Sequence, residues 1–323
     1  MDRSSGEQIT GDSMKKINEI LGMKYPIIQG AMANIATGEF AAACSNAGAF
    51  GIVAVGGLPP EKFEEEIIKC KKLTDKPFGV NIMLMHPQAD DIADIIARNP
   101  VAAVTTGAGN PGKYISMWKE KGIFVMPVVA SVLLAERMVN AGADAVIAEG
   151  TESGGHVGEM TTMALVPQMV DRLDVPVIAA GGIADGRGMA AAYALGACGV
   201  QVGTCLLASN ECPIHENYKQ AVINAGDNAT VVTGRSAHAP VRVLKNKMAR
   251  KYLQMELKGS DRDELEKLTL GSLRKAVFDG DADNGSLMSG QICGLVKEIK
   301  PLEEIFKEMT EGCNRVIGDL QGR

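Results

Sequence analysis

One of the four histidines in this 323-residue chain lies among glycines, in the stretch EGTESGGHVGEM at 149–160. His156 follows Gly154 and Gly155, and Gly158 comes two positions later. An imidazole titrates near neutral pH, so it can donate or accept a proton during a reaction. Glycine disfavours backbone order, so the stretch predicts a loop rather than a helix or strand. We interpret it as a loop that brings backbone N–H groups and the imidazole close to a flat ligand, with a plain surface histidine as the alternative.

Glycine and small polar residues also follow two later apolar runs. Gly181 and Gly182 end the run PVIAAGG, and Gly203 and Thr204 end the run GVQVGT. Loops after the seventh and eighth strands of a parallel barrel commonly bind phosphate through backbone N–H groups. These residues therefore predict a phosphate site, with simple turn glycines as the alternative.

Two polar side chains stand near the ends of other apolar runs. Asn81 lies in PFGVNIML (77–84), and Glu149 lies in DAVIAEG (144–150). A polar side chain at the inward-facing end of a buried strand usually needs a ligand or a hydrogen-bond partner. Both residues are candidates for ligand binding, and an internal hydrogen bond is the alternative for each.

Eight apolar runs of strand length must position these residues. Amphipathic segments separate the runs, for example 60–73 and 131–142, with a repeat of roughly 25 residues per strand–helix unit. The pattern predicts an α/β fold, a (β/α)8 TIM barrel. A doubly wound open sheet is the alternative, but no G-x-G-x-x-G motif follows the first run. The runs are 25–32, 51–57, 77–84, 101–109, 122–130, 144–150, 175–182 and 198–204.

The strand–helix repeat ends after Thr204. Residues 209–285 are more polar and show no strand-like runs, which predicts a small helical cap or substrate domain near the top of the barrel. The barrel itself is expected from 14–208 together with 286–323. Residues 1–13 are polar and aperiodic, and we expect a leader or an extension there.

Composition excludes several classes of function. The net charge of −6 and the pI near 5.4 give no overall basic field for nucleic acid. No apolar run is long enough to span a membrane, and no signal peptide is visible. The seven cysteines show no spacing typical of a metal site. We expect reduced thiols, no metal and a cytoplasmic protein.

Several motifs together resemble enoyl-acyl carrier protein reductase II, a flavin-dependent bacterial family related to the nitronate monooxygenases. They are PIIQGAM, KPFGVNIML, AVTTGAGNP, SGGHVG, PVIAAGGIADG, QVGT and DGDADNGSLMSGQICGLV. The resemblance runs from about Met14 to the C-terminus. It implies a TIM barrel that holds FMN and reduces trans-2-enoyl-acyl carrier protein with NAD(P)H in fatty acid biosynthesis. It also implies a catalytic role for His156 and flavin contacts at Ala31, Met32, Asn81, Glu149, Gly155, Gly181, Gly182, Gln201, Gly203 and Thr204.

The resemblance further implies a homodimer and a monovalent cation, although no set of cation ligands is visible in the sequence. Nitronate monooxygenase is the alternative enzyme, since it uses the same barrel and a similarly placed histidine as a base. A non-catalytic barrel that binds flavin or a metabolite is the third possibility. The chain departs from the family pattern at Pro240, where HA more often runs straight into VR.

A basic run occupies 234–252 of this acidic chain and contains no acidic residue. It predicts a surface that docks acyl carrier protein, which is acidic, or that holds the phosphates of NADPH. A solvated helix face is the alternative. The run's charged side chains are Arg235, Arg242, Lys245, Lys247, Arg250 and Lys251.

Overall fold

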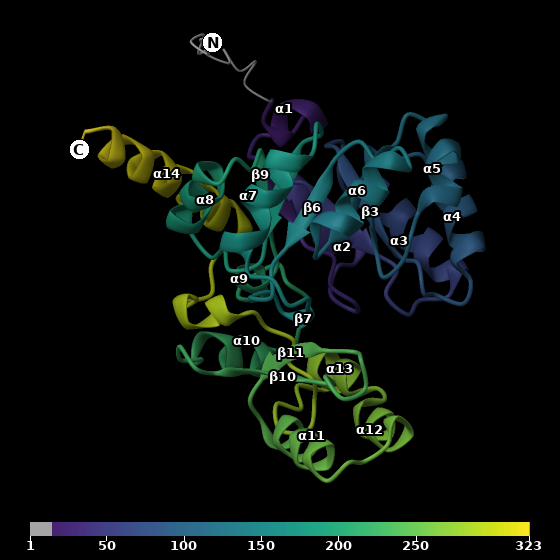
Figure 1. Ribbon diagram of the computed structural model, residues 1–323, viewed down its shortest axis with the longest axis vertical. Coiled ribbons are helices and arrows are strands. Elements are labelled where there is room, and N and C mark those ends of the chain that lie inside the picture. Colours follow the sequence, from purple (N-terminus) through teal and green to yellow (C-terminus); the bar gives the residue numbers. More distant parts are fainter. Residues whose placement is uncertain (1–14, 323) are drawn as a thin grey trace, which may run out of the picture.

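A computed structural model describes residues 15–322 (Figure 1). Eight parallel strands form a barrel with helices between them, which confirms the predicted (β/α)8 TIM-barrel fold. The predicted leader at 1–13 lies outside the described residues. In sheet order the strands are β1 (Ile27–Gln29), β9 (Gly199–Val202), β8 (Val177–Ala180), β6 (Val146–Glu149), β5 (Phe124–Val129), β4 (Ala103–Gly107), β3 (Phe78–Met83) and β2 (Gly51–Ala54).

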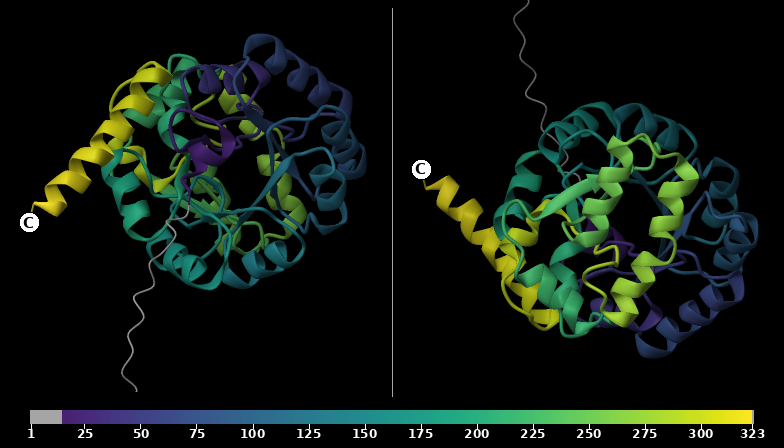
Figure 2. Two further views of the ribbon diagram at one scale, coloured as in Figure 1. Left: turned by 90° about the horizontal axis from the view of Figure 1, so that it is seen from above. Right: turned by 90° about the horizontal axis from the view of Figure 1, so that it is seen from below.

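Amphipathic helices form the outer layer of the barrel (Figure 2). Each buries one apolar face on the strands, as Ile92, Ile95 and Ile96 do in α4, because apolar residues recur at helical spacing. The last helix, α14, packs against α8 and touches α2. These helices are α2 (Gly38–Asn46), α3 (Pro60–Leu73), α4 (Ala89–Arg98), α5 (Gly112–Lys119), α6 (Val132–Asn140), α7 (Thr162–Arg172), α8 (Gly186–Ala194) and α14 (Leu302–Gln321).

A short helix, α1 (Ile17–Leu21), covers the amino-terminal end of the barrel. The Ile17 amide donates a hydrogen bond of 3.0 Å to the Cys198 carbonyl oxygen, just before β9. The Ile17 side chain is fully buried in the same apolar cluster as Ile28 and Ile147 of the strands. Any access to the barrel interior therefore comes from the carboxyl-terminal ends of the strands.

The barrel closes between β1 and β2 through a buried side chain. Only one isolated parallel bridge, between Ile28 and Phe50, joins the two strands. The fully buried Gln29 amide makes the next connection. Its Nε2 donates to the Ile52 carbonyl oxygen at 3.1 Å, and its Oε1 accepts from the Ile52 amide at 3.0 Å. One glutamine side chain thus takes the place of the backbone pairing that a longer β1 would supply.

The cap follows a short helix, α9 (Thr204–Leu207), at the carboxyl end of β9. It lies on the side of the barrel where a short strand, β7 (Gly155–His156), emerges (Figure 1). The chain then returns through η2 (Gln291–Leu295) to α14. The cap elements are α10 (Glu216–Ile223), β10 (Thr230–Thr233), β11 (Val241–Leu244), α11 (Lys247–Leu257), α12 (Arg262–Thr269), α13 (Ser272–Arg274) and η1 (Lys275–Asp279).

Two details of the cap differ from the sequence analysis. The expectation that 209–285 lacks strands was wrong, because β10 and β11 pair there as an antiparallel hairpin. Each has only four residues and lies in a polar neighbourhood, which hid the pattern. The helical character predicted for the cap is also not continuous over 260–280, where the chain is divided into α12, α13 and η1. Gly271, with φ of 72°, adopts the left-handed conformation that interrupts it.

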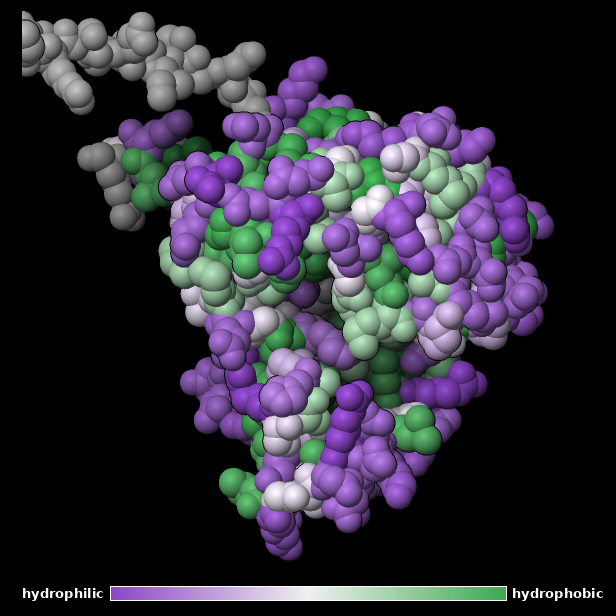
Figure 3. All heavy atoms as spheres, turned by 45° about the vertical axis from the view of Figure 1, so that its right-hand side comes forward, coloured by the Kyte–Doolittle hydropathy of each residue, from purple (hydrophilic) through white to green (hydrophobic). Residues whose placement is uncertain are grey.

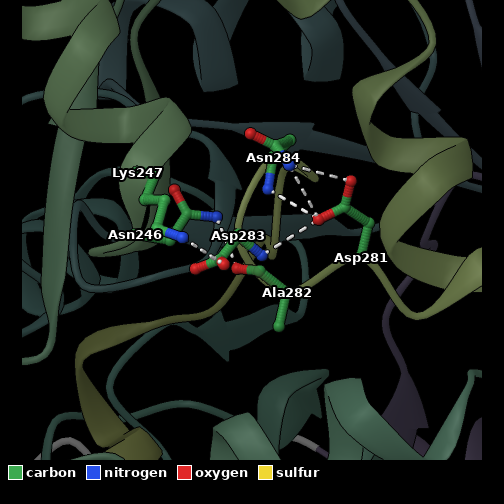
Figure 4. Close-up of polar contacts among 6 residues, drawn as sticks. All are labelled: Asn246, Lys247, Asp281, Ala282, Asp283 and Asn284. Atoms are coloured by element: carbon green, nitrogen blue, oxygen red, sulfur yellow. Dashed lines mark hydrogen bonds and ion pairs between the residues drawn. The ribbon is translucent and has the colours of Figure 1, made fainter.

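Side-chain hydrogen bonds tie the start of α11 to a tight turn at 281–284 (Figure 4). The Asn246 Nδ2 donates to the Ala282 carbonyl oxygen at 2.9 Å, while its Oδ1 caps the helix by accepting from the Ala249 amide. Lys247 pairs with Asp283 at 2.7 Å. The turn sits at the base of the hairpin and positions the second half of the cap.

We predict that Gln29→Leu destabilises the fold. Leucine fills similar space but leaves the buried N–H and C=O of Ile52 without partners, which costs roughly 2–4 kcal/mol in the free energy of unfolding. Denaturant unfolding measures the change. Gln220→Leu, at an exposed position of α10 where the side chain bonds only to Glu216, is the control and should change stability little. An equal loss in both variants would contradict the role of Gln29 in closure.

Candidate active site

The carboxyl ends of the barrel strands face the cap across a hollow that is visible in the space-filling view (Figure 3). Strands β1, β9, β8 and β6 are consecutive in the sheet. Their ends bring Met32, Gln201, Gly181 and Glu149 to one arc of the rim. Asn81, on β3, comes from a separate part of the ring. The strand ends thus gather around one opening residues as far apart in the sequence as Met32 and Gln201, which are 169 positions apart.

The side chains of Gln201 and Glu149 and the Oδ1 atom of Asn81, all at this opening, have no hydrogen-bond partner within residues 15–322. Gln201 is 8% exposed, yet neither atom of its amide bonds to protein. The Glu149 carboxylate, partly buried, also forms neither a hydrogen bond nor an ion pair. Asn81 donates from Nδ2 to the Thr105 hydroxyl at 3.0 Å, and its Oδ1 accepts nothing. Buried polar groups are normally paired, so these three groups are available to a ligand.

Burial raises the pKa of Glu149 to about 7. No cation or donor offsets the loss of water around this carboxyl, so its charged form is disfavoured. Glu149 therefore changes protonation state near neutral pH. In its neutral form it can donate a hydrogen bond to a ligand, and in its charged form it can only accept one.

The histidine loop is more ordered than its glycines predict. Gly155 and His156 form a short strand, β7 (Gly155–His156), that pairs antiparallel with β11 of the cap. The expectation that this stretch cannot form a strand was therefore wrong. Gly155 has φ of 78°, a conformation that favours glycine, and Gly154 leaves no room for a Cβ, which would lie 2.7 Å from the Gly290 amide nitrogen. The glycines allow close backbone packing, and that packing fixes the loop.

The His156 ring is exposed on one side, and the protein around it lowers its pKa from the ordinary value of 6.5. Burial is the cause, because it disfavours the imidazolium. The ring is consequently neutral at pH 7, with one N–H donor and one acceptor nitrogen. Such a ring can donate a hydrogen bond to a developing negative charge or accept a proton.

The backbone conformation of the turn after β8 requires glycine at 181 and 182. Their φ values are 91° and 74°, both in the left-handed region. A Cβ at Gly181 would also lie 2.8 Å from the Gly150 carbonyl oxygen. These two glycines could therefore be present for the turn alone.

Gly203 differs, because neither its backbone nor its packing requires glycine. Its φ is −130°, and an added Cβ would meet only the Met32 sulfur, at 3.6 Å. Thr204 follows, and its hydroxyl accepts from the Gly290 amide at 2.8 Å, which leaves its hydrogen free to donate. There is open space above Gly203, just after β9, and Gly181 and Gly182 lie beside it, just after β8. This space suits the close approach of a phosphate to backbone N–H groups.

The basic run does not form one surface. Lys245 bonds to Asn228, and Lys247 pairs with Asp283, which lies outside the run. Arg242 points inward and is 7% exposed; it binds the carbonyl oxygen of Thr151 in the histidine loop. The sequence analysis missed this role, because the partner lies 91 positions away. The charged side chains of Arg235, Arg250 and Lys251 form no ion pair or hydrogen bond in the described part of the chain.

Other kinds of site are not indicated by the described residues. Within 15–322, no three His, Cys, Asp or Glu side chains are grouped so that they could hold a metal ion. No helix in that range combines the length and apolar character needed to cross a membrane. The seven cysteines are buried and free.

We predict a pH-dependent stability difference that depends on Glu149. The raised pKa means that the folded protein holds a proton that the unfolded chain releases, so this stability is present below about pH 4.5 and is lost as pH rises to about 7. Denaturant unfolding of cofactor-free protein should show wild type losing on the order of 3 kcal/mol relative to Glu149→Gln over this range. Glu159→Gln, an exposed change in the same loop, is the control; a flat difference would contradict the buried carboxyl.

Comparison with known proteins identifies the family to which the chain belongs. The family model described as nitronate monooxygenase matches residues 14–103 and 93–312. The structure of FabK from Thermotoga maritima, an enoyl-acyl carrier protein reductase II, has a TM-score of 0.92 at 47% identity and covers 95% of this chain and 98% of that chain. A probable nitronate monooxygenase of Staphylococcus saprophyticus is 33% identical, covering 93% of this chain and 99% of its own.

A further relative acts on a thioester according to its name. This (3aS,4S,5R,7aS)-5-hydroxy-7a-methyl-1-oxo-octahydro-1H-indene-4-carboxyl-CoA dehydrogenase of Mycobacterium tuberculosis is 31% identical over 91% of this chain and 94% of its own. The matches extend over the barrel and the cap together. The chain therefore belongs to the nitronate monooxygenase family, and within it resembles enoyl-acyl carrier protein reductase II.

Proposed function

We propose that this protein is an FMN-dependent enoyl-acyl carrier protein reductase that reduces trans-2-enoyl thioesters with NAD(P)H. The observation that carries the proposal is the likeness to FabK at 47% identity, which includes the cap and covers nearly all of both chains. The unpaired polar groups around the barrel opening support the binding of a ligand there. Their number and type suit a flavin, which offers ring nitrogens, carbonyl oxygens, ribityl hydroxyls and a phosphate.

The residues at the opening fit FMN. The space above Gly203, beside Gly181, Gly182 and the Thr204 hydroxyl, would take the phosphate. Gln201, Glu149 and Asn81 would bond to the polar parts of the ring and ribityl chain, and Ala31, Met32 and Gly155 would contact the remainder. Held by these residues, FMN would supply hydride-transfer chemistry between NAD(P)H and the β-carbon of the enoyl thioester.

His156 would assist the thioester. As the β-carbon is reduced, negative charge develops on the thioester oxygen, and a correctly placed N–H group stabilises it. The lowered pKa of His156 keeps the ring neutral at pH 7, so hydrogen-bond donation is the role it can perform without first taking up a proton. Delivery of a proton to the α-carbon is the second role, and it would be favoured at lower pH.

Nitronate monooxygenase is the alternative, supported by the names of curated relatives at 33% identity. A neutral His156 could serve there as the base. Two assays separate the candidates: NAD(P)H oxidation with crotonyl thioester, and oxygen uptake with propyl-2-nitronate. Reduction of the thioester without nitronate oxidation supports our proposal, and the reverse result supports the alternative. A colourless protein that gains no colour with FMN would favour a barrel without flavin chemistry.

We further propose that acidic acyl carrier protein presents the substrate and that the enzyme acts as a homodimer. The positive side chains of Arg235, Arg250 and Lys251 are free of acidic partners and could meet acidic side chains of the carrier. Lys245 and Lys247 are already engaged with Asn228 and Asp283, so they would contribute less. The proposal includes a monovalent cation as an activator of the enzyme.

We predict that Gly203→Ala weakens FMN binding and leaves the apoprotein folded. The apoprotein has space for the methyl group, but the phosphate would need the same space. Overfilling a site typically costs about 1–3 kcal/mol, so affinity should fall roughly 10- to 100-fold. Flavin fluorescence titration measures it. Gly318→Ala in α14, also at an open position, is the control. Unchanged affinity in Gly203→Ala would place the phosphate elsewhere.

We predict that His156→Ala keeps its fold and its FMN but loses enoyl reduction. Loss of one donor to a developing oxyanion costs about 2.7–4 kcal/mol, or on the order of 100- to 1,000-fold in kcat. Flavin reduction by NAD(P)H should suffer much less, because that half-reaction has no carbonyl to stabilise. Stopped-flow spectra separate the two half-reactions, and His238→Ala, at an exposed position of the cap, is the control. Enoyl reduction near the wild-type rate in His156→Ala would refute this role.

A further inference from the structure

Arg242 is a buried cation whose hydrogen bonds, in the part of the chain that the structure describes, all go to neutral oxygens. The residue is 7% exposed. Its Nε and Nη2 donate to the carbonyl oxygen of Thr151 at 3.1 and 3.0 Å, and its Nη1 donates to the Thr230 hydroxyl at 3.2 Å. Burial of a charge costs folding free energy unless the charge is well hydrogen-bonded, so a buried guanidinium at this position indicates a structural or functional role.

The two contacts of Arg242 join the cap to the start of the histidine loop. Thr230 lies on β10 of the cap, whereas Thr151 follows β6 of the barrel. Two parallel N–H groups on one carbonyl oxygen restrain its direction as well as its distance. The restrained peptide lies only five positions before His156.

The same cap strand holds the other end of the loop. Arg242 is opposite Gly155 and Val241 is opposite His156 in the β7–β11 pairing. The Val157 amide then donates to the Pro240 carbonyl oxygen at 3.1 Å. The cap therefore contacts the loop before, at and after His156.

The opposite face of the loop packs against the returning chain. The Gln291 amide donates to the Glu152 carbonyl oxygen at 2.9 Å, and the backbone at Ser289 and Gly290 lies against Gly154. The loop's glycines provide no side chains of their own to pack. Within the loop, the Glu152 carboxylate accepts from the Thr162 amide and hydroxyl at 3.0 Å and fixes the loop to the start of α7. From the cap, among the described residues, Arg242 holds the loop with two side-chain hydrogen bonds.

We propose that Arg242 is a positioning residue for His156: its grip on the Thr151 carbonyl, together with the β7–β11 pairing, holds the imidazole in place over the barrel opening. The catalytic aspect rests on the proposed function, in which His156 acts on the thioester. A cap residue would thereby control the geometry of a barrel residue, and Arg242 itself would touch neither cofactor nor substrate.

Three variants test the proposal in the FMN-loaded enzyme. Arg242→Met keeps the apolar stem and removes every donor. Arg242→Lys keeps the charge and a single donor group that can still reach one carbonyl oxygen. Thr230→Val removes only the Nη1 contact within the cap and leaves both bonds to Thr151, so it is the matched control.

The first measurement is hydrogen–deuterium exchange, which does not depend on any activity. In Arg242→Met, amides in 151–157 should exchange roughly 10- to 100-fold faster, since hydrogen bonds to charged groups are lost from the loop. Protection in α11 should be retained. Arg242→Lys should lie between Arg242→Met and wild type, and Thr230→Val should match wild type. Unchanged exchange at 151–157, or equally faster exchange across the whole cap, would overturn the proposal.

The second measurement separates positioning from general support. Arg242→Met should slow enoyl reduction roughly 10- to 100-fold with little effect on flavin reduction by NAD(P)H, and Arg242→Lys should recover part of the loss. In a His156→Ala background, Arg242→Met should add no further loss, because both changes remove the same contribution. An equal loss in both backgrounds would overturn the proposal.

The experiments distinguish failure of the proposed function from failure of the proposal for Arg242. If wild type does not reduce enoyl thioesters but oxidises a nitronate, the same double-mutant comparison is made on that reaction. If neither reaction occurs, faster exchange confined to 151–157 in Arg242→Met still supports the positioning of the loop, and unchanged exchange still overturns it.

Discussion

Closure of the barrel between its first two strands is the constraint on which the site depends. Residues that approach one another across the opening do so only if eight strands complete a ring. The ring is weakest between β1 and β2, where a single backbone bridge joins Ile28 and Phe50. The buried Gln29 amide replaces the missing pairing with Ile52. Since Met32 follows β1 and Asn81 lies beyond β2, this side chain and the Ile28–Phe50 bridge together join two walls of the opening.

The barrel and the cap contribute differently to the candidate site. The barrel supplies Glu149, Gln201 and the glycines at the strand ends, all on rigid elements. The His156 imidazole is on a barrel loop that the cap holds through β11. Relative movement of the cap would therefore alter the position of His156 more than that of the residues proposed to hold the cofactor.

Much of this architecture could be predicted from local sequence. The eight barrel strands fall within the eight predicted runs, and α3 matches the amphipathic segment 60–73, because apolar periodicity reports burial directly. Strands β10 and β11 could not be predicted, because four residues carry too little pattern. The order of the His156 loop and the inward direction of Arg242 depend on partners far along the chain. Of the candidate site, the strand-end positions were predictable, whereas the contacts that restrain the histidine were not.

The position of the cap within the chain has a consequence for biosynthesis. The cap lies between β9 and α14, and α14 packs against α8 and touches α2 near the beginning of the chain. During translation, all the barrel strands and the entire cap leave the ribosome before the helix that covers this side of the barrel. Until then the apolar surfaces of α8 and α2 remain accessible to chaperones and to other nascent chains. Docking of α14 therefore joins helices that are far apart in the sequence, a slow class of contact because of its long separation.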